Sequence, residues 1–174
     1  ASVFEYYAEE GRRVHGSIRP NGTHATMSMV TYHPVGTVAA IVPWNYPVDL
    51  YAWKVAPALA AGCPVIVKPP EEAPLAIGMV SRLLIEAGLP DGALADLPGG
   101  ADVGQYLSSS PRIAMVTATC STATGKAIMR TAAENLTRVS LELGGHCPLV
   151  VLKDADIATA AAAAARRAFS NMGQ

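Results

Sequence analysis

The sequence has few of the features that mark secreted, metal-binding or nucleic-acid-binding proteins. Its three cysteines, at positions 63, 120 and 147, are widely spaced and form no C-x-x-C pair, so they indicate neither a disulfide framework nor a zinc or redox site. The formal net charge is −1, which gives no basic face for nucleic acid or for an anionic membrane. We therefore expect no metal, no nucleic-acid partner, and a reducing, cytoplasmic setting.

Long apolar runs are also missing. No run approaches the roughly 18 residues that a membrane-spanning helix needs, so we expect no membrane association. The first seven residues, Ala1–Tyr7, contain neither the basic nor the apolar region of a signal peptide. The sequence starts without Met and reads like the middle of a helix, which suggests a piece of a longer protein.

The composition is that of a folded protein. Hydrophobic residues make up 51% of the 174 residues and charged residues 16%, which is typical of a globular chain with a real core. Residues 1–34 differ from the rest, because Phe4–Val14 has helical spacing and Met27–Tyr32 alternates apolar with polar residues. We interpret residues 1–34 as a helix and strand arm and residues 35–174 as the main domain.

Strand-like and helix-like runs alternate from Val35 onward. This alternation predicts an α/β fold, a doubly wound parallel sheet with helices on both faces. The expected strands are Thr37–Val42, Val65–Lys68, Ala93–Leu97, Ile113–Thr117, Arg138–Leu141 and Leu149–Leu152. The expected helices are Val48–Ala61, Leu75–Ala87, Val103–Ser108, Thr122–Ala133 and Ile157–Phe169.

Ligands of such sheets bind beyond the carboxyl ends of the strands, so the residues that follow each strand are the candidates for a site. After the first strand, two prolines flank Asn45, whose amide could stabilise an oxyanion; an ordinary turn explains the same residues. After the second, Lys68 and Glu71 could bind a phosphate or a ribose, or form a solvated surface pair.

Two later strands end in similar candidates. Ser121 opens a run of small and hydroxyl residues at a helix start, which suits a phosphate but also serves as a plain helix cap. Glu142 ends an apolar strand just before two glycines. Loss of water around it would raise its pKa and make it a general base, whereas the alternative is a carboxylate that caps a nearby turn.

Taken together, these segments resemble the aldehyde dehydrogenase superfamily over essentially the whole chain. Six motifs in the right order carry the resemblance: Pro43-Trp44-Asn45-Tyr46-Pro47, Ala58-Leu59-Ala60-Ala61-Gly62, Lys68-Pro69-Pro70-Glu71, Ser121-Thr122-Ala123-Thr124-Gly125-Lys126, Leu141-Glu142-Leu143-Gly144-Gly145 and Phe169-Ser170-Asn171-Met172-Gly173-Gln174. The resemblance implies a Rossmann-like domain that binds NAD or NADP.

The resemblance also implies a role for each candidate. Asn45 would stabilise the oxyanion, Glu142 would be the general base, and Lys54 would serve a proton relay. Leu50 and Trp53 would face the aldehyde substrate. The cofactor-binding residues would be Val42, Pro43, Trp44, Lys68, Glu71, Ser121, Gly125 and Leu143.

Two further expectations concern cofactor choice and assembly. A carboxylate at the ribose would repel a 2′-phosphate, so Glu71 favours NAD over NADP. The strand at Met27–Tyr32 matches the family's oligomerisation segment, which implies a homodimer or homotetramer for the intact protein.

The departures from the family pattern are also informative. Ala118-Thr119-Cys120-Ser121 stands where the family usually has Phe-Thr-Gly-Ser, so Cys120 places a side chain near the expected pyrophosphate. The family's nucleophilic cysteine would be the second residue after Gln174, and none of the three cysteines present has a neighbouring base. We expect all three to be buried and structural.

Three functions fit these observations. The first is part of an enzyme that oxidises an aldehyde, with some likeness to semialdehyde dehydrogenases, to a carboxylate through a thioester. The second is a catalytically silent nucleotide-binding fragment. The third is a relative that passes the acyl group to coenzyme A, which Glu142 disfavours because a water-activating base has less use there.

Overall fold

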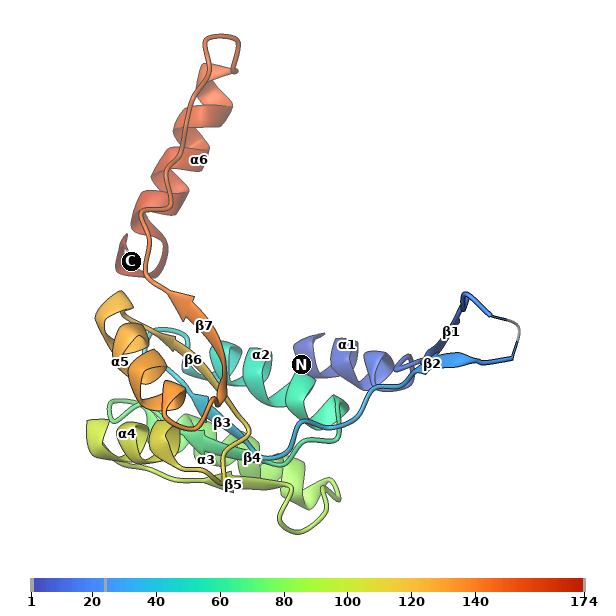
Figure 1. Ribbon diagram of the computed structural model, residues 1–174. Helices are drawn as coiled ribbons and strands as arrows, with labels where there is room; N and C mark the ends of the chain where they lie inside the picture. Colours follow the sequence, from blue (N-terminus) through green and yellow to red (C-terminus); the bar gives the residue numbers. More distant parts are fainter. Residues whose placement is uncertain (1, 24, 174) are drawn as a thin grey trace. The chain divides into compact units, whose positions relative to one another are not determined.

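Five parallel strands form the centre of the fold. The computed structural model describes residues 2–23 and 25–173, and its main sheet has the order β5-β4-β3-β6-β7 (Figure 1). The strands are β3 (Val38–Ile41), β4 (Val65–Lys68), β5 (Leu94–Asp96), β6 (Met115–Cys120) and β7 (Arg138–Leu143). The chain first builds outward from β3 to β5 and then returns to add β6 and β7 on the other side. The sequence-based prediction of a doubly wound parallel sheet is confirmed.

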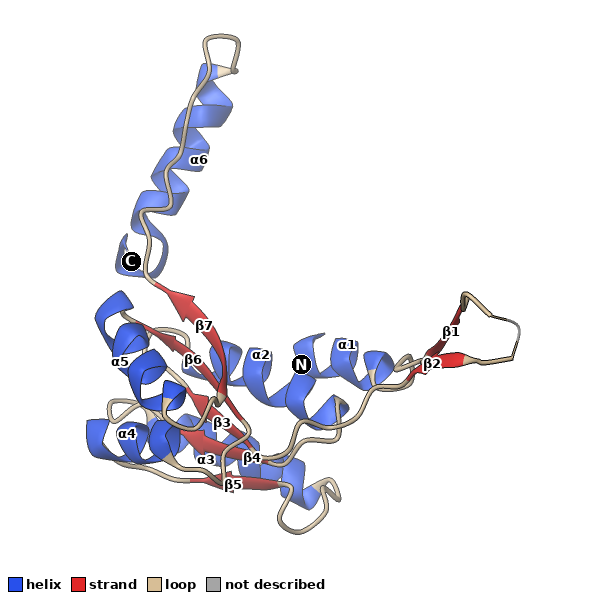
Figure 2. Cartoon of the chain, viewed as in Figure 1, coloured by secondary structure: helices blue, strands red, loops and turns tan. Residues whose placement is uncertain are grey.

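Helices connect the strands and cover both faces of this sheet (Figure 2). They are α2 (Pro47–Ala60), α3 (Pro74–Glu86), α4 (Ala101–Ser109) and α5 (Thr122–Ala133). Side chains of α2 and α3 pack with Ala40 and Val42 in one buried cluster, whereas side chains of α4 and α5 pack with Ala39 in another. Because neighbouring residues of a strand point to opposite faces, the short apolar strand β3 supplies both clusters.

The helix boundaries follow the local chemistry of the sequence. Gly62 and Gly88 adopt positive φ angles of 75° and 98° just beyond α2 and α3, which glycine tolerates without steric strain. Pro47 and Pro74 lie in the first turns of these helices, where a missing N–H leaves no hydrogen bond unmade.

A buried hydrogen-bond chain links α2, α3 and β5. The Ser81 hydroxyl donates to Asp96 Oδ1 at 2.9 Å, so the Tyr51 hydroxyl, 2.8 Å from Ser81 Oγ, must donate to Ser81. Burial raises the pKa of Tyr51 to about 12. Burial also raises the pKa of Asp96, and the hydrogen bond from Ser81 only partly opposes it.

The hydrogen bonds that join Tyr51, Ser81 and Asp96 predict how the stability of the fold depends on pH. The pKa of Asp96 is higher in the folded than in the unfolded protein. Its contribution to the free energy of unfolding is therefore fully present at acidic pH and is lost as the pH rises through the pKa of the folded state. Asp96→Asn keeps an acceptor for Ser81 without the charge. The variant should therefore melt above the wild type near neutral pH, and the difference should shrink toward about pH 4. Thermal unfolding at several pH values checks this; a pH-independent difference would contradict it.

The N-terminal part contains α1 (Ser2–Glu10) and a two-stranded antiparallel sheet of β1 (Ser17–Arg19) and β2 (Ser28–Val30). The helix and second strand were predicted with longer bounds, Phe4–Val14 and Met27–Tyr32. β1 was not predicted, because three residues of mixed polarity give no alternation to read. Ile18 and Met29, which pair across this sheet, are 67% and 68% exposed.

Residues 145–174 form a compact unit separate from residues 1–144. Its helix α6 (Ile157–Phe169) was predicted and is capped by Asp156, which accepts a hydrogen bond from the backbone N–H of Thr159 at 2.8 Å. Hydrogen bonds from the Thr159 side chain and from its backbone N–H lower the pKa of Asp156. A short 3-10 turn, Ser170–Gly173, follows.

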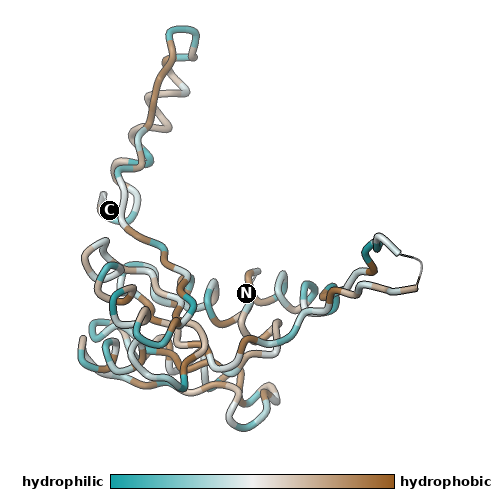
Figure 3. The backbone as a smooth tube through the Cα atoms, in the orientation of Figure 1, coloured by the Kyte–Doolittle hydropathy of each residue, from teal (hydrophilic) through white to brown (hydrophobic). Residues whose placement is uncertain are grey.

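The predicted strand at Leu149–Leu152 is wrong. The run is strongly apolar, as Figure 3 shows, but it has no strand assignment and its side chains are 48–75% exposed. A strand needs a partner to pair its backbone groups, and the described part of residues 145–174 contains none. The apolar pattern alone therefore does not make a strand, because its backbone finds no pairing partner.

Two of the expected absences concern membrane-spanning helices and metal sites. Within the described ranges, no helix is long and apolar enough to cross a membrane. Across the same residues, no group of three or more His, Cys, Asp or Glu side chains is placed to hold a metal ion.

Candidate functional site

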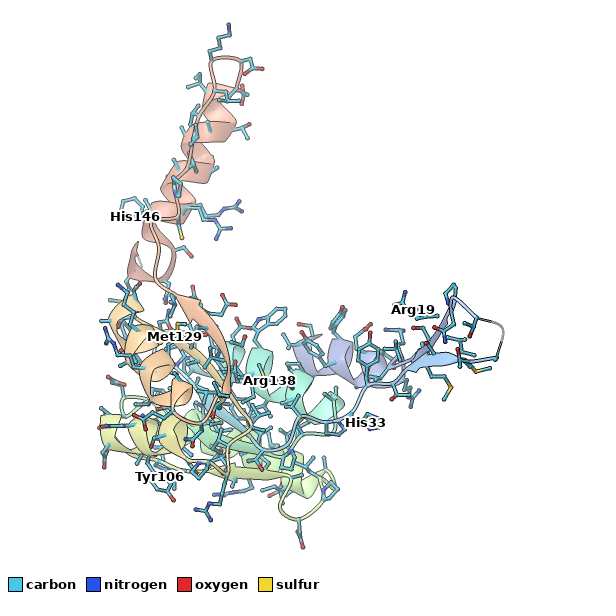
Figure 4. The ribbon with its side chains drawn as sticks, in the orientation of Figure 1. Arg19, His33, Tyr106, Met129, Arg138 and His146 are labelled. Atoms are coloured by element: carbon cyan, nitrogen blue, oxygen red, sulfur yellow. The ribbon has the colours of Figure 1, made fainter. Side chains whose placement is uncertain are left out.

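The candidate residues gather at the carboxyl edge of the main sheet. Since all five strands are parallel, the segments that follow β3, β4, β6 and β7 leave the sheet at the same edge. These segments carry Asn45, Glu71 and Ser121, and Glu142 is the second-last residue of β7. Arg138, labelled in Figure 4, marks the opposite end of β7. The strand order reverses between β3 and β6, which is where such sheets place their ligands.

The two faces of the sheet separate the candidates into two groups. Thr119 of β6 pairs with Glu142 of β7, and Cys120 pairs with Leu143. Side chains alternate along a strand, so Glu142 and Leu143 point to opposite faces. Leu143 lies against α5: a Cβ atom on Gly125 would come within 2.5 Å of a Leu143 methyl carbon. Glu142 therefore points to the face that α2 covers.

Lys54 of α2 lies within electrostatic reach of Glu142 on that face. Its side chain is only 5% exposed, and burial lowers its pKa, while the nearby carboxyl of Glu142 and thiol of Cys120 act in the opposite direction. A buried lysine with a lowered pKa and a carboxylate nearby is a candidate for proton transfer. Glu142 itself is exposed, so the expectation that it is desolvated is wrong for this chain. β7 ends one residue later, at Leu143, and the described residues of 1–144 leave the Glu142 side chain exposed.

Lys68 and Glu71 lie across the sheet from Lys54. Lys68 is 8% exposed and donates to the Pro69 carbonyl at 3.2 Å, while its stem passes within 3.7 Å of the Cβ position of Gly104. A solvated surface pair is therefore the wrong interpretation for Lys68. Glu71 is exposed, and one carboxylate oxygen lies 3.2 Å from the Cβ position of Gly100 in the segment before α4.

Ser121 caps the helix that follows β6. Its hydroxyl accepts the backbone N–H of Thr124 at 3.2 Å, so the helix-cap interpretation is correct. The cap leaves other N–H groups of the first turn of α5 without helical partners, which keeps the helix start suitable for an anion. Gly125 is buried one turn further on, beneath Leu143.

The segment after β3 holds the remaining cofactor candidates and the amide. Val42 is buried and donates its N–H to the Lys68 carbonyl at 3.1 Å, which fixes the start of the segment. Pro43 follows, half-buried, and Trp44 is 56% exposed. The side-chain oxygen of Asn45 is buried without a hydrogen-bond partner among the described residues. Unpaired buried polar atoms are uncommon and are concentrated at functional sites.

The two residues expected to face an aldehyde differ in their surroundings. Leu50 is half-buried and packs against the core cluster under α2 and α3. Trp53 is 52% exposed, and its ring lies edge-on to that of Tyr7 in α1, with 6.4 Å between the ring centroids. Trp53 therefore presents a large apolar surface that the first 144 residues only partly cover.

Sequence reasoning did not single out Thr119. Its hydroxyl is buried without a partner in the described part of the chain, and it stands directly opposite Glu142. The signal was accessible in principle, since residues paired across a parallel sheet share a face, but the register was not known from the sequence.

The three cysteines are less uniform than expected. Cys63 is buried, as predicted. Cys120 is only half-buried; burial raises the pKa of its thiol and the Lys54 ammonium partly opposes this, which is unfavourable for a nucleophile. The prediction is wrong for Cys147, which is exposed in the segment that follows β7.

The position of Cys120 gives a testable consequence. It ends β6, one residue before the cap of α5, so a side chain stands where the family pattern has glycine. Cys120→Gly in the full-length protein should tighten NAD(P)+ binding, by about 1 kcal/mol if it relieves modest crowding. Calorimetric titration measures this. Unchanged or weaker binding, with Cys63→Ala as the control, would show that the loop already accommodates the thiol.

Comparison with known proteins agrees with this arrangement. A family model described as "Aldehyde dehydrogenase family" matches residues 1–174. The chain is 45% identical over 175 residues to "Succinate-semialdehyde dehydrogenase, mitochondrial" of Arabidopsis thaliana, a match that covers 100% of the chain and 33% of that protein.

Two solved structures have the same fold. One is described as an E. coli NADP dependent enzyme, with a TM-score of 0.97 and 38% identity over 99% of this chain and 36% of that one. The other is PnpE in complex with nicotinamide adenine dinucleotide, with a TM-score of 0.95 and 38% identity over 99% and 35% of the two chains. The chain thus spans about a third of the length of these relatives.

Proposed function

Because the chain belongs to the aldehyde dehydrogenase family, we propose that the full-length protein oxidises an aldehyde to a carboxylate with NAD(P)+. The observation that carries the proposal is the division of the candidates over the two faces at one sheet edge. Lys68, Gly125 and Leu143 lie on the face of α4 and α5, where a cofactor would sit. Lys54 and Glu142 lie on the face of α2.

The residues on the first face fit a dinucleotide. The buried ammonium of Lys68 has three N–H donors and one carbonyl acceptor within the described structure, so it can bind a ribose hydroxyl or a phosphate. Glu71 would accept from the ribose, and the start of α5 at Ser121 would face the pyrophosphate. Val42, Pro43, Trp44, Gly125 and Leu143 would line the rest. When bound, the cofactor accepts the hydride that leaves the substrate.

The residues at the other face and in the turn after β3 would stabilise the developing negative charge and transfer protons. Asn45 would donate its amide N–H to the oxygen of the reacting carbonyl, and Leu50 and Trp53 would contact the aldehyde. The acyl group would be held as a thioester on a cysteine that the family resemblance places beyond Gln174. Glu142 would take a proton from the water that hydrolyses this thioester, and Lys54 would relay it.

Several finer points belong to the same proposal. The substrate is a semialdehyde, as the name of the Arabidopsis relative suggests for that protein. Glu71 favours NAD, because its carboxylate would repel a 2′-phosphate. The exposed apolar residues of β1 and β2 suit pairing in a homodimer or homotetramer. The unpaired cysteines suit a reducing, cytoplasmic location.

The test is an assay of the purified full-length protein with NAD+ and NADP+. Succinate semialdehyde should be oxidised with a higher kcat/KM than butanal, which has the same chain length but no carboxylate. Absence of oxidation of any aldehyde with either cofactor would overturn the proposed function. Equal kcat/KM for the two aldehydes would overturn only the semialdehyde preference.

A further inference from the structure

A second carboxylate lies beside the one expected to bind the cofactor ribose. Asp102 is in the first turn of α4, and its Oδ1 lies 3.1 Å from the point where a Cβ atom of Gly100 would be. Glu71 Oε1 lies 3.2 Å from the same point. Both side chains are exposed, and their two carboxylates converge beside Gly100.

The buried side chain of Lys68 packs against the same helix. The stem of Lys68 contacts Gly104, in the same first turns of α4 as Asp102, at 3.7 Å from its Cβ position. Lys68 is more than nine-tenths buried, and only one of its three N–H donors has an acceptor among the residues described. A buried cation with donors left over suits a ligand oxygen near the first turns of α4, and this observation does not depend on the two carboxylates.

The start of α4 would otherwise attract a phosphate. Gly100, its cap residue, has no side chain to bond the first N–H groups, and the helix dipole adds partial positive charge there. A 2′-phosphate, with a charge of about −1.5 to −2, would therefore bind favourably at a helix start that carries no acidic residue. Asp102 places a negative charge in that turn and reverses the preference.

We propose that Asp102 is a specificity-determining residue that, with Glu71, excludes the 2′-phosphate of NADP from the ribose site. The proposal rests on the proposed function, since it assumes that the ribose binds beside Lys68. The two carboxylates have different tasks. Glu71 accepts hydrogen bonds from the ribose hydroxyls and also repels a phosphate. Asp102 acts only by repelling the phosphate, so it disfavours the wrong ligand without binding the right one.

The test uses ADP-ribose and its 2′-phosphate, which lack the nicotinamide and so report on the adenosine end alone. Calorimetric titration of the full-length protein gives the ratio of the two Kd values. Asp102→Asn should shift the ratio toward the phosphorylated ligand by about threefold to tenfold, the range expected for exposed charges, and the shift should shrink at high salt. Asp102→Glu, which keeps the charge, should stay near the wild type.

A matched control and the opposing outcomes complete the experiment. Asp91→Asn removes the same charge from an exposed turn just before β5, at the amino end of that strand. This variant should leave the ratio of the two Kd values unchanged. An equal shift in Asp91→Asn, or no shift in Asp102→Asn while ADP-ribose still binds, overturns the role of Asp102 and leaves the proposed function intact. Failure of the wild type to bind either ligand overturns the cofactor site and this inference with it.

Discussion

Glu142→Gln in the full-length protein should abolish steady aldehyde oxidation while an initial burst of reduced cofactor remains. The burst reports formation of the thioester, which does not require Glu142 if another base activates the nucleophile. Release of the acid requires an activated water, and loss of a general base typically slows such a step by about 10²–10⁴-fold. Rapid mixing followed by steady-state measurement separates the two phases.

The environment of Glu142 refines this expectation. The carboxylate lies on the face of α2, within electrostatic reach of buried Lys54, whose lowered pKa makes it a fit partner for proton transfer. Lys54→Met should therefore also slow the steady phase and alter its pH profile, since the relay loses a titrating group. Glu134→Gln, an exposed acid at the far end of α5, is the control and should keep normal turnover. Undiminished turnover in Glu142→Gln would remove Glu142 from the mechanism.

Asn45→Ala in the full-length protein should lower kcat by about 10²–10³-fold, the usual loss for one oxyanion donor. Cofactor affinity should change little, because Asn45 would contact the reacting carbonyl rather than the nucleotide. The side-chain oxygen of Asn45 is buried without a hydrogen-bond partner within the described chain, which marks this amide as a candidate for a ligand contact.

The control for Asn45 is a second amide with a structural task. Asn135 donates to the Ser109 carbonyl at 2.7 Å and lies at the opposite end of α5 from the candidate site. Asn135→Ala should lower the melting temperature but leave kcat close to the wild type. A near-normal kcat in Asn45→Ala would return the segment after β3 to an ordinary turn, the interpretation that the spacing of its prolines alone favours.

Much of the fold follows from local sequence features. Apolar runs of four to six residues between helix-spaced segments predicted all five strands of the main sheet within a few residues. Gly62, Gly88 and Pro74 marked helix ends because their backbone preferences act locally and need no tertiary partner. The order of motifs after the strands likewise identified the family and placed the candidate residues at one edge.

What the sequence left open depends on contacts between distant residues. Leu149–Leu152 has the composition of a strand, yet a strand also needs a neighbour, and no local pattern supplies one. Burial of Lys68, exposure of Glu142 and the convergence of Glu71 with Asp102 arise only when β4, β7 and α4 are brought to the same sheet. The sequence determined the elements and the chemistry of each segment through local backbone and side-chain preferences. The tertiary structure decided which side chains share a face, because strand register and helix packing are properties of pairs of segments.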